Sequence, residues 1–91
     1  MTGAEALRAA LASLEVNEDF SEAVLSLRDG SRLTFRHRVG ERWAKAEPAP
    51  DAAGTVLAEQ VLALVGHFRL NGKHLDVRFR DGSRWEAGFR G

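Results

Sequence analysis

A repeated pentapeptide constrains what this chain can fold into more than any other feature of its sequence. Arg-Asp-Gly-Ser-Arg occurs at residues 28–32 and again at 80–84. The apolar residues that flank it also correspond, because Leu33 follows the first copy where Trp85 follows the second. Two copies are too few for a solenoid, which needs about three or more repeats. The sequence therefore predicts a duplicated unit rather than a repeat array.

The chain length of 91 residues fits one compact domain and is short for two. We therefore expect a single domain over residues 1–91, made of two internal repeats at about 1–39 and 52–91. The segment 40–51 between them holds both prolines of the chain and has no counterpart in the second repeat. We expect this Pro-containing segment to join the two repeats.

The first repeat begins with apolar residues at the spacing of one helix face. This stripe consists of Leu7, Ala10, Leu11 and Leu14. Thr2 precedes it, and Glu5 follows three residues later, which is the pattern of a capping box. The pattern predicts a helix near the N-terminus.

The second repeat has a similar stripe, which consists of Leu57, Val61, Leu64, Val65 and Phe68. Asp51 is the expected N-cap of this second helix, and Gly66 marks its expected end. Val56 and Leu62 widen the apolar face, so we expect this helix to be the more buried of the two. An alternative for 66–75 is a short strand at His67–Leu70 that turns at Asn71-Gly72, a strong hairpin dipeptide.

Two strands follow each helix, because apolar and polar residues alternate over 22–39 and 73–90. Cross-strand partners share a face, which favours a three-residue loop with glycine in the left-handed conformation. We therefore expect positive φ angles at Gly30 and Gly82, and Leu25 opposite Leu33. In the second hairpin this loop places Arg78 opposite Arg84, whereas the loop Asp81-Gly82-Ser83 would place Arg78 opposite Glu86.

The element order is therefore α-β-β-α-β-β, and the expected fold class is α+β. The two helices are expected to pack on one face of a four-stranded, mostly antiparallel sheet. The other face of that sheet is polar and forms a candidate binding face that consists of Arg32, Arg36, Arg38, Arg78, Arg84 and Arg90.

This arginine face has two interpretations. Guanidinium groups bind phosphate and carboxylate in a bidentate manner, so the face could attract nucleic acid or an acidic protein. An open antiparallel face is also polar in proteins that bind nothing there, and Glu22, Asp76 and Glu86 lie among the arginines. Trp43 in the joining segment is a candidate interface anchor, since tryptophan is enriched at the centre of interfaces. The other interpretation, which the continued alternation favours, is that Trp43 caps the end of the core.

The sequence contains no pattern that is typical of a catalytic or metal-binding site. The chain has no cysteine, and His37, His67 and His74 lack the spacing of metal ligands. We expect no catalytic residue, no cofactor and no metal. No segment is apolar enough to span a membrane and no secretory signal is present, so we expect a cytoplasmic protein.

The expected function is a small non-enzymatic interaction module that self-associates, as a homodimer, or docks on a protein partner. The alternative is a nucleic-acid-binding protein that uses the arginine face.

Overall fold

The computed structural model describes residues 1–17, 21–38, 43–50, 54–71 and 74–88. Its elements in chain order are α1 (Gly3–Ala10), β1 (Leu11–Val16), β2 (Glu22–Leu27), β3 (Arg32–Arg38), β4 (Trp43–Pro48), α2 (Val56–Leu64), β5 (Val65–Asn71), β6 (His74–Phe79) and β7 (Arg84–Gly88). The strands form two antiparallel sheets, one ordered β1-β2-β3-β4 and the other β5-β6-β7. The fold class is α+β, as the sequence predicts.

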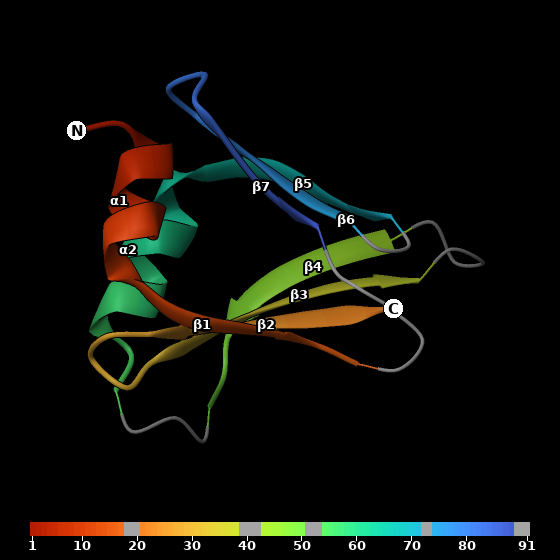
Figure 1. Ribbon diagram of the computed structural model, residues 1–91, viewed down its shortest axis with the longest axis horizontal. Helices are drawn as coiled ribbons and strands as arrows, with labels where there is room; N and C mark the ends of the chain where they lie inside the picture. The colour runs from red at the N-terminus through yellow and green to blue at the C-terminus, as the bar shows by residue number, and fades with distance from the viewer. Residues whose placement is uncertain (18–20, 39–42, 51–53, 72–73, 89–91) are drawn as a thin grey trace.

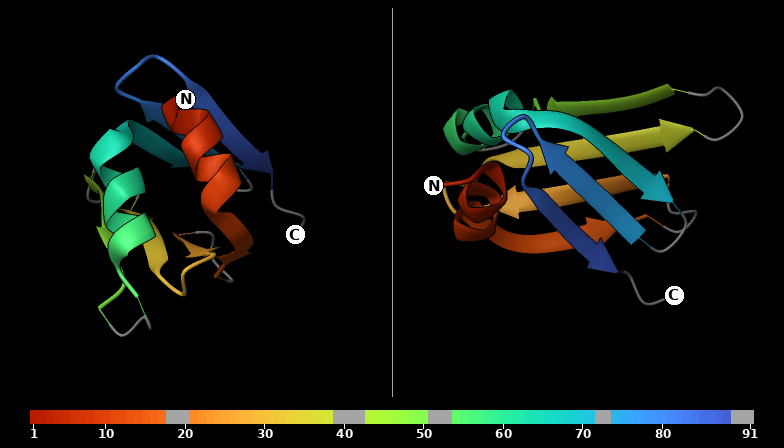
Figure 2. Two further views of the ribbon diagram at one scale, coloured as in Figure 1. Left: turned by 90° about the vertical axis from the view of Figure 1, so that its left-hand side faces the viewer. Right: turned by 90° about the horizontal axis from the view of Figure 1, so that it is seen from above.

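The two sheets face each other, and the two helices lie side by side and antiparallel at one end of them (Figures 1 and 2). The core lies between the sheets and behind the helices. It includes Leu7 of α1, Leu25 and Phe35 of the first sheet, and Val77 of the second, all of which are buried. The Phe35 ring meets the Phe68 ring edge to face, with centroids 4.8 Å apart and planes at 70°. Aromatic packing therefore joins the two sheets directly.

The expected single four-stranded sheet is wrong, because the structure has three strands beyond the expected four, namely β1, β4 and β5. The helices end at Ala10 and Leu64, and the chain continues as β1 and β5. Each of these strands contains a bulge near its start, between Leu11 and Ser13 or between Val65 and His67. The extra residue of a bulge lets side chains three positions apart share one face, which is also the spacing of a helix stripe. This coincidence explains why the pattern predicts longer helices.

The alternative of a strand at His67–Leu70 is confirmed, although the strand is longer than expected. These residues lie inside β5, which pairs with β6. Gly66 therefore lies in a strand rather than at a helix end. The capping box of Thr2 and Glu5 is confirmed. Thr55 occupies the N-cap of α2 and makes no side-chain cap hydrogen bond, while the expected cap Asp51 lies outside the described residues.

The predicted hairpins are confirmed in loop type and in register. The φ angles are 87° at Gly30 and 88° at Gly82. Leu25 lies opposite Leu33, and Arg78 lies opposite Arg84, so the alternative loop in the second hairpin is wrong.

The joining segment 40–51 contains a further strand that the sequence does not predict. β4 lies within it and pairs with β3 at one edge of the first sheet. Pro48 is its last residue, a position that tolerates the missing N–H because the strand has a partner on one side only.

Each Asp-Gly-Ser turn caps the helix of the other half of the chain. Asp29 Oδ2 accepts a hydrogen bond from the Leu57 amide (2.9 Å), and Ser31 Oγ accepts one from the Ala58 amide (3.1 Å). In the second turn, Asp81 Oδ2 accepts from the Gly3 amide (2.8 Å). Amides at a helix N-terminus lack partners within the helix, and these side chains satisfy them. Each half of the chain therefore caps the helix N-terminus of the other half.

Candidate functional site

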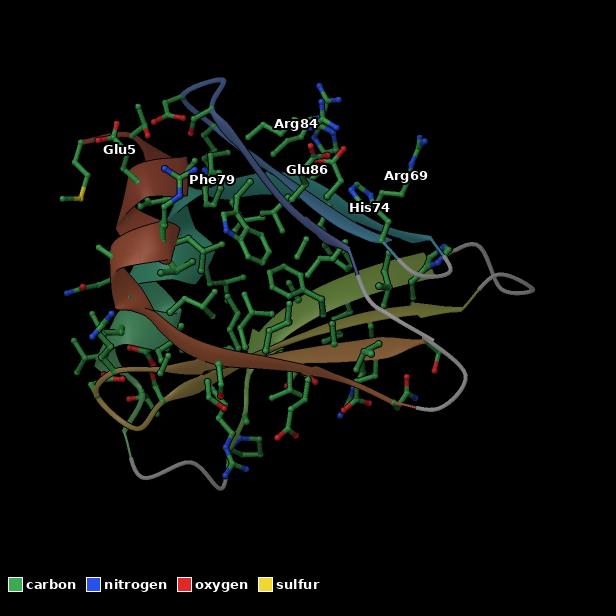
Figure 3. All side chains as sticks on the ribbon, in the orientation of Figure 1. Glu5, Arg69, His74, Phe79, Arg84 and Glu86 are labelled. Carbon is green, nitrogen blue, oxygen red and sulfur yellow. The ribbon has the colours of Figure 1, made fainter. Side chains whose placement is uncertain are left out.

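The structure divides the predicted arginine face between two sheets. Arg32 and Arg36 are exposed on the outer side of β3, whereas their neighbours toward the other sheet are buried. Arg78 and Arg84 are exposed on the second sheet, and Figure 3 shows Arg84 on the side of that sheet that faces away from the first sheet. The side chain of Arg38 and all of Arg90 lie outside what the structure describes. A single face with all six arginines is therefore wrong, because it requires one sheet.

On the first sheet, Arg36 lies between two acids. Its Nε is 3.2 Å from Glu22 Oε2, and its Nη1 is 3.4 Å from Glu47 Oε1. Exposed pairs of this kind add little stability, but they neutralise the arginine.

On the second sheet, Arg84 is also paired. Its Nε donates to Asp76 Oδ1 (3.1 Å) and its Nη2 to Glu86 Oε2 (2.7 Å). The hydrogen bond to Asp76, with the charges of both acids, raises the pKa of Arg84 above its ordinary value. Glu86 also lies 3.1 Å from His74 Nε2 (Figure 3). Arg84 is therefore part of a compensated network.

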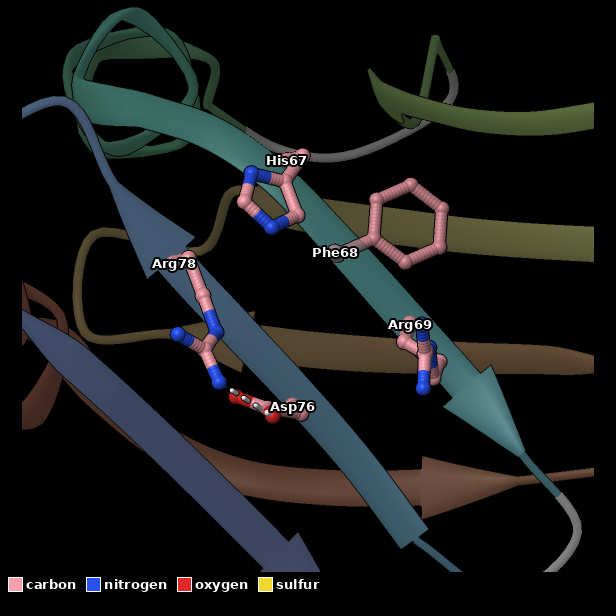
Figure 4. A pocket seen from close by; sticks show the side chains of 5 residues that line it. All are labelled: His67, Phe68, Arg69, Asp76 and Arg78. Carbon is pink, nitrogen blue, oxygen red and sulfur yellow. Dashed lines mark ion pairs between the residues drawn. The ribbon is translucent and has the colours of Figure 1, made fainter.

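A shallow pocket lies beside this network, on the outer side of β5 and β6. It has a volume of about 240 Å³ and is lined by His67, Phe68, Arg69, Asp76 and Arg78 (Figure 4). We call it the β5–β6 pocket. The sequence analysis missed Arg69 and His67, because it favoured a helix end there. The signal that could have found them is the Asn71-Gly72 dipeptide, which predicts a hairpin with polar residues alternating before it.

A second surface that the sequence analysis missed is on α2. Its exposed residues recur at the helical spacing i, i+3, i+4, i+7 and i+8, and they are Val56, Glu59, Gln60, Ala63 and Leu64. We call this set the α2 outer stripe. Val56 is 59% exposed and Leu64 is 41% exposed. The expectation that this helix is the more buried one is wrong, since α1 buries four residues and α2 buries two, Ala58 and Val61.

Trp43 is the first residue of β4, and its backbone lies opposite Arg38. Its side chain lies outside what the structure describes, so its role as an interface anchor stays a prediction. Among the described residues, no group of three or more His, Cys, Asp or Glu side chains could hold a metal ion. Neither described helix has the length and apolar character needed to cross a membrane.

Comparisons of the chain with protein-family models, with curated proteins and with solved structures find no match.

Proposed function

We propose that this chain is a small non-enzymatic interaction module that associates with a second copy of itself through the α2 outer stripe. The observation that carries this proposal is the exposure of Val56 and Leu64 on a helix whose only charged residue is Glu59. A surface helix normally presents a charged face to water. α1, at the same end of the molecule, fits that rule, since Glu5 and Arg8 are exposed on it. The difference between two neighbouring helices favours a specific contact at α2.

The net charge of the chain and the charges at the ends of α2 favour a second copy as the partner of the α2 outer stripe. The formal net charge of the chain is zero, so two copies approach each other without net repulsion. Glu59 lies in the first turn of α2, and Arg80 Nε donates to the carbonyl of Val65, the residue that follows the last turn (3.4 Å). Antiparallel pairing of two α2 helices brings the acidic end of each near the arginine end of the other. This geometry suits a symmetric dimer.

The expected association is weak. Nine helical residues extend over about 14 Å. Standard stable interfaces bury roughly 800 Å² per partner, which one such helix does not supply. We therefore expect a dissociation constant of about micromolar or weaker.

Sedimentation velocity over a concentration series tests this proposal with a matched pair of variants. Ala63→Lys places a charge in the α2 outer stripe, and we expect it to weaken dimerisation at least about tenfold. Ala9→Lys is the control, because Ala9 is also exposed and also last but one in its helix. A lysine near a helix C-terminus favours the helix, so neither variant should unfold the protein. A monomeric wild-type protein at every concentration, or equal weakening by both variants, would overturn the proposal.

The alternative function, nucleic-acid binding, was motivated by a single arginine face, and the described arginines do not form one. The described arginines of the predicted face lie on two opposite surfaces, and Arg36 and Arg84 are paired with acids. A duplex needs a continuous row of unpaired cations to release counterions. The placement of these side chains therefore favours a protein contact over nucleic acid.

A further inference from the structure

We infer that the β5–β6 pocket binds a small oxyanion of the phosphate-monoester class, held by Arg69 and Arg78 with His67 beside them (Figure 4). The pocket is formed by residues of β5 and β6, whereas the α2 outer stripe is formed by residues of α2. Variants can therefore test the pocket separately from the proposed self-association.

Arg78 has a second arginine directly across the sheet and only a long ion pair with an acid. It lies opposite Arg84 on β7 and opposite His67 on β5. Two arginines directly opposite each other on neighbouring strands destabilise a sheet. The nearest acid is Asp76, whose Oδ2 is 3.9 Å from Arg78 Nη2. That distance is too long for a hydrogen bond, so Arg78 retains its hydrogen-bonding capacity.

Asp76 does not neutralise the pocket, because its stronger partner is outside it. Its Oδ1 accepts from Arg84 Nε at 3.1 Å, and its side chain is only 16% exposed. Within the described part of the chain, Arg69 and His67 make no ion pair. One acid therefore faces two guanidinium groups and an imidazole in the same pocket, and that acid is shared with Arg84.

The chemistry of these groups indicates the class of ligand. Guanidinium groups bind phosphate oxygens in pairs of parallel hydrogen bonds, and two of them suit a group with several equivalent oxygens. A phosphate monoester carries close to two negative charges near neutral pH. The volume of about 240 Å³ is below the roughly 300–1,000 Å³ of pockets for larger organic ligands. The pocket therefore fits the charged group itself rather than a large attached molecule.

The corresponding places on the first sheet lack cations. There, the bulge of β1 is followed by Ser13 opposite Ser26 and by Glu15 opposite Val24. On the second sheet the same places hold His67 opposite Arg78 and Arg69 opposite Asp76. The positive pocket therefore belongs to the residues of the second half and is not a consequence of the fold shared by both halves.

A titration with inorganic phosphate, followed by amide NMR shifts at constant ionic strength, tests this inference. We expect saturable shifts at His67, Arg69 and Arg78, and at least about tenfold weaker binding in Arg69→Gln, which loses charge-assisted hydrogen bonds. Arg32→Gln is the matched control, since Arg32 is exposed on the first sheet and makes no ion pair among the described residues. It should bind phosphate as the wild type does. Equal weakening of phosphate binding in both variants would show that the affinity depends only on the total charge of the protein, and it would overturn the proposed site.

Two further ligands distinguish the chemistry and its source. Acetate should bind at least about tenfold more weakly than phosphate, because it carries one charge and two oxygens. Acetate binding as tight as phosphate binding would overturn the assigned class. A short phosphoserine peptide should shift the same three amides. Tighter binding of the peptide than of free phosphate would identify a phosphorylated protein as the source, and equal binding would identify the free anion.

Discussion

Ser31 connects the first hairpin to the second helix through a fully buried hydroxyl. The hydroxyl donates to Asp29 Oδ1 (2.5 Å) and accepts from the Ala58 amide (3.1 Å). Ser31→Ala leaves that amide without an acceptor in a buried place, so we expect the free energy of unfolding to fall by about 1–3 kcal/mol. Denaturation in urea measures this loss.

Ser83 is the matched control at this scale, because it makes the same two contacts, to Asp81 and to the Ala4 amide. Its side chain is only partly buried, so water can replace the hydroxyl in Ser83→Ala. We expect a smaller loss of unfolding free energy there. Equal losses in the two variants, or none in Ser31→Ala, would contradict the assigned roles.

The turn itself could be predicted from single residues, but its partners could not. The parity of Leu27 and Leu33 selects the three-residue loop, and the loop requires glycine at positions 30 and 82. Asp29 and Asp81 were interpreted as turn formers only. Their second oxygen reaches a helix amide in the other half, a contact that depends on how the halves pack rather than on any local pattern.

At the scale of elements, the junctions between turns and helices should be sensitive to acid. The hydroxyl of Ser31, then the amides of Leu57 and Ser31, hold the pKa of Asp29 below its ordinary value, and Ser83 with Gly3 does the same for Asp81. A lowered pKa means that the folded protein favours the carboxylate. The resulting stability is present above the ordinary aspartate pKa of about 3.9 and is lost as the pH falls through the lower folded-state pKa.

We therefore expect the double variant Asp29→Asn/Asp81→Asn to be less stable than the wild type near neutral pH and to lose less stability on acidification. Urea denaturation at a series of pH values from neutral to below about 4 measures both effects. Glu15→Gln removes an exposed acid that makes no hydrogen bond among the described residues, so its profile should follow that of the wild type. Parallel profiles for the double variant and the wild type would show that these carboxylates do not stabilise the junctions.

Element boundaries were the part of the fold that the sequence could not determine. Leu11 and Leu14 fit a helix stripe, and they fit a bulged strand equally well, because both place residues three apart on one face. Which structure forms depends on a second strand being available to pair. In the same way, the exposure of Val56 could not be inferred from its apolar side chain, since burial depends on what covers it.

At the scale of the whole molecule, the three strands beyond the expected four change the architecture. Two helices cannot cover the apolar side of seven strands, so the strands form two sheets whose apolar sides cover each other. The helices then close one end of the molecule, and each receives its cap from the far half. The candidate site changes for the same reason. Arginines predicted to share one surface lie on two, and the pocket that remains is formed with a strand the sequence analysis did not favour.

The contact between Phe35 and Phe68 tests this two-sheet arrangement most directly. Their ring centroids are 4.8 Å apart, and they come from different sheets. We expect strong nuclear Overhauser cross-peaks between the two rings, absent in Phe68→Leu, together with strand-type cross-peaks between β5 and β6. If the rings show no mutual cross-peak and Phe68 instead gives helical cross-peaks to Leu64 and Val65, the two facing sheets are wrong.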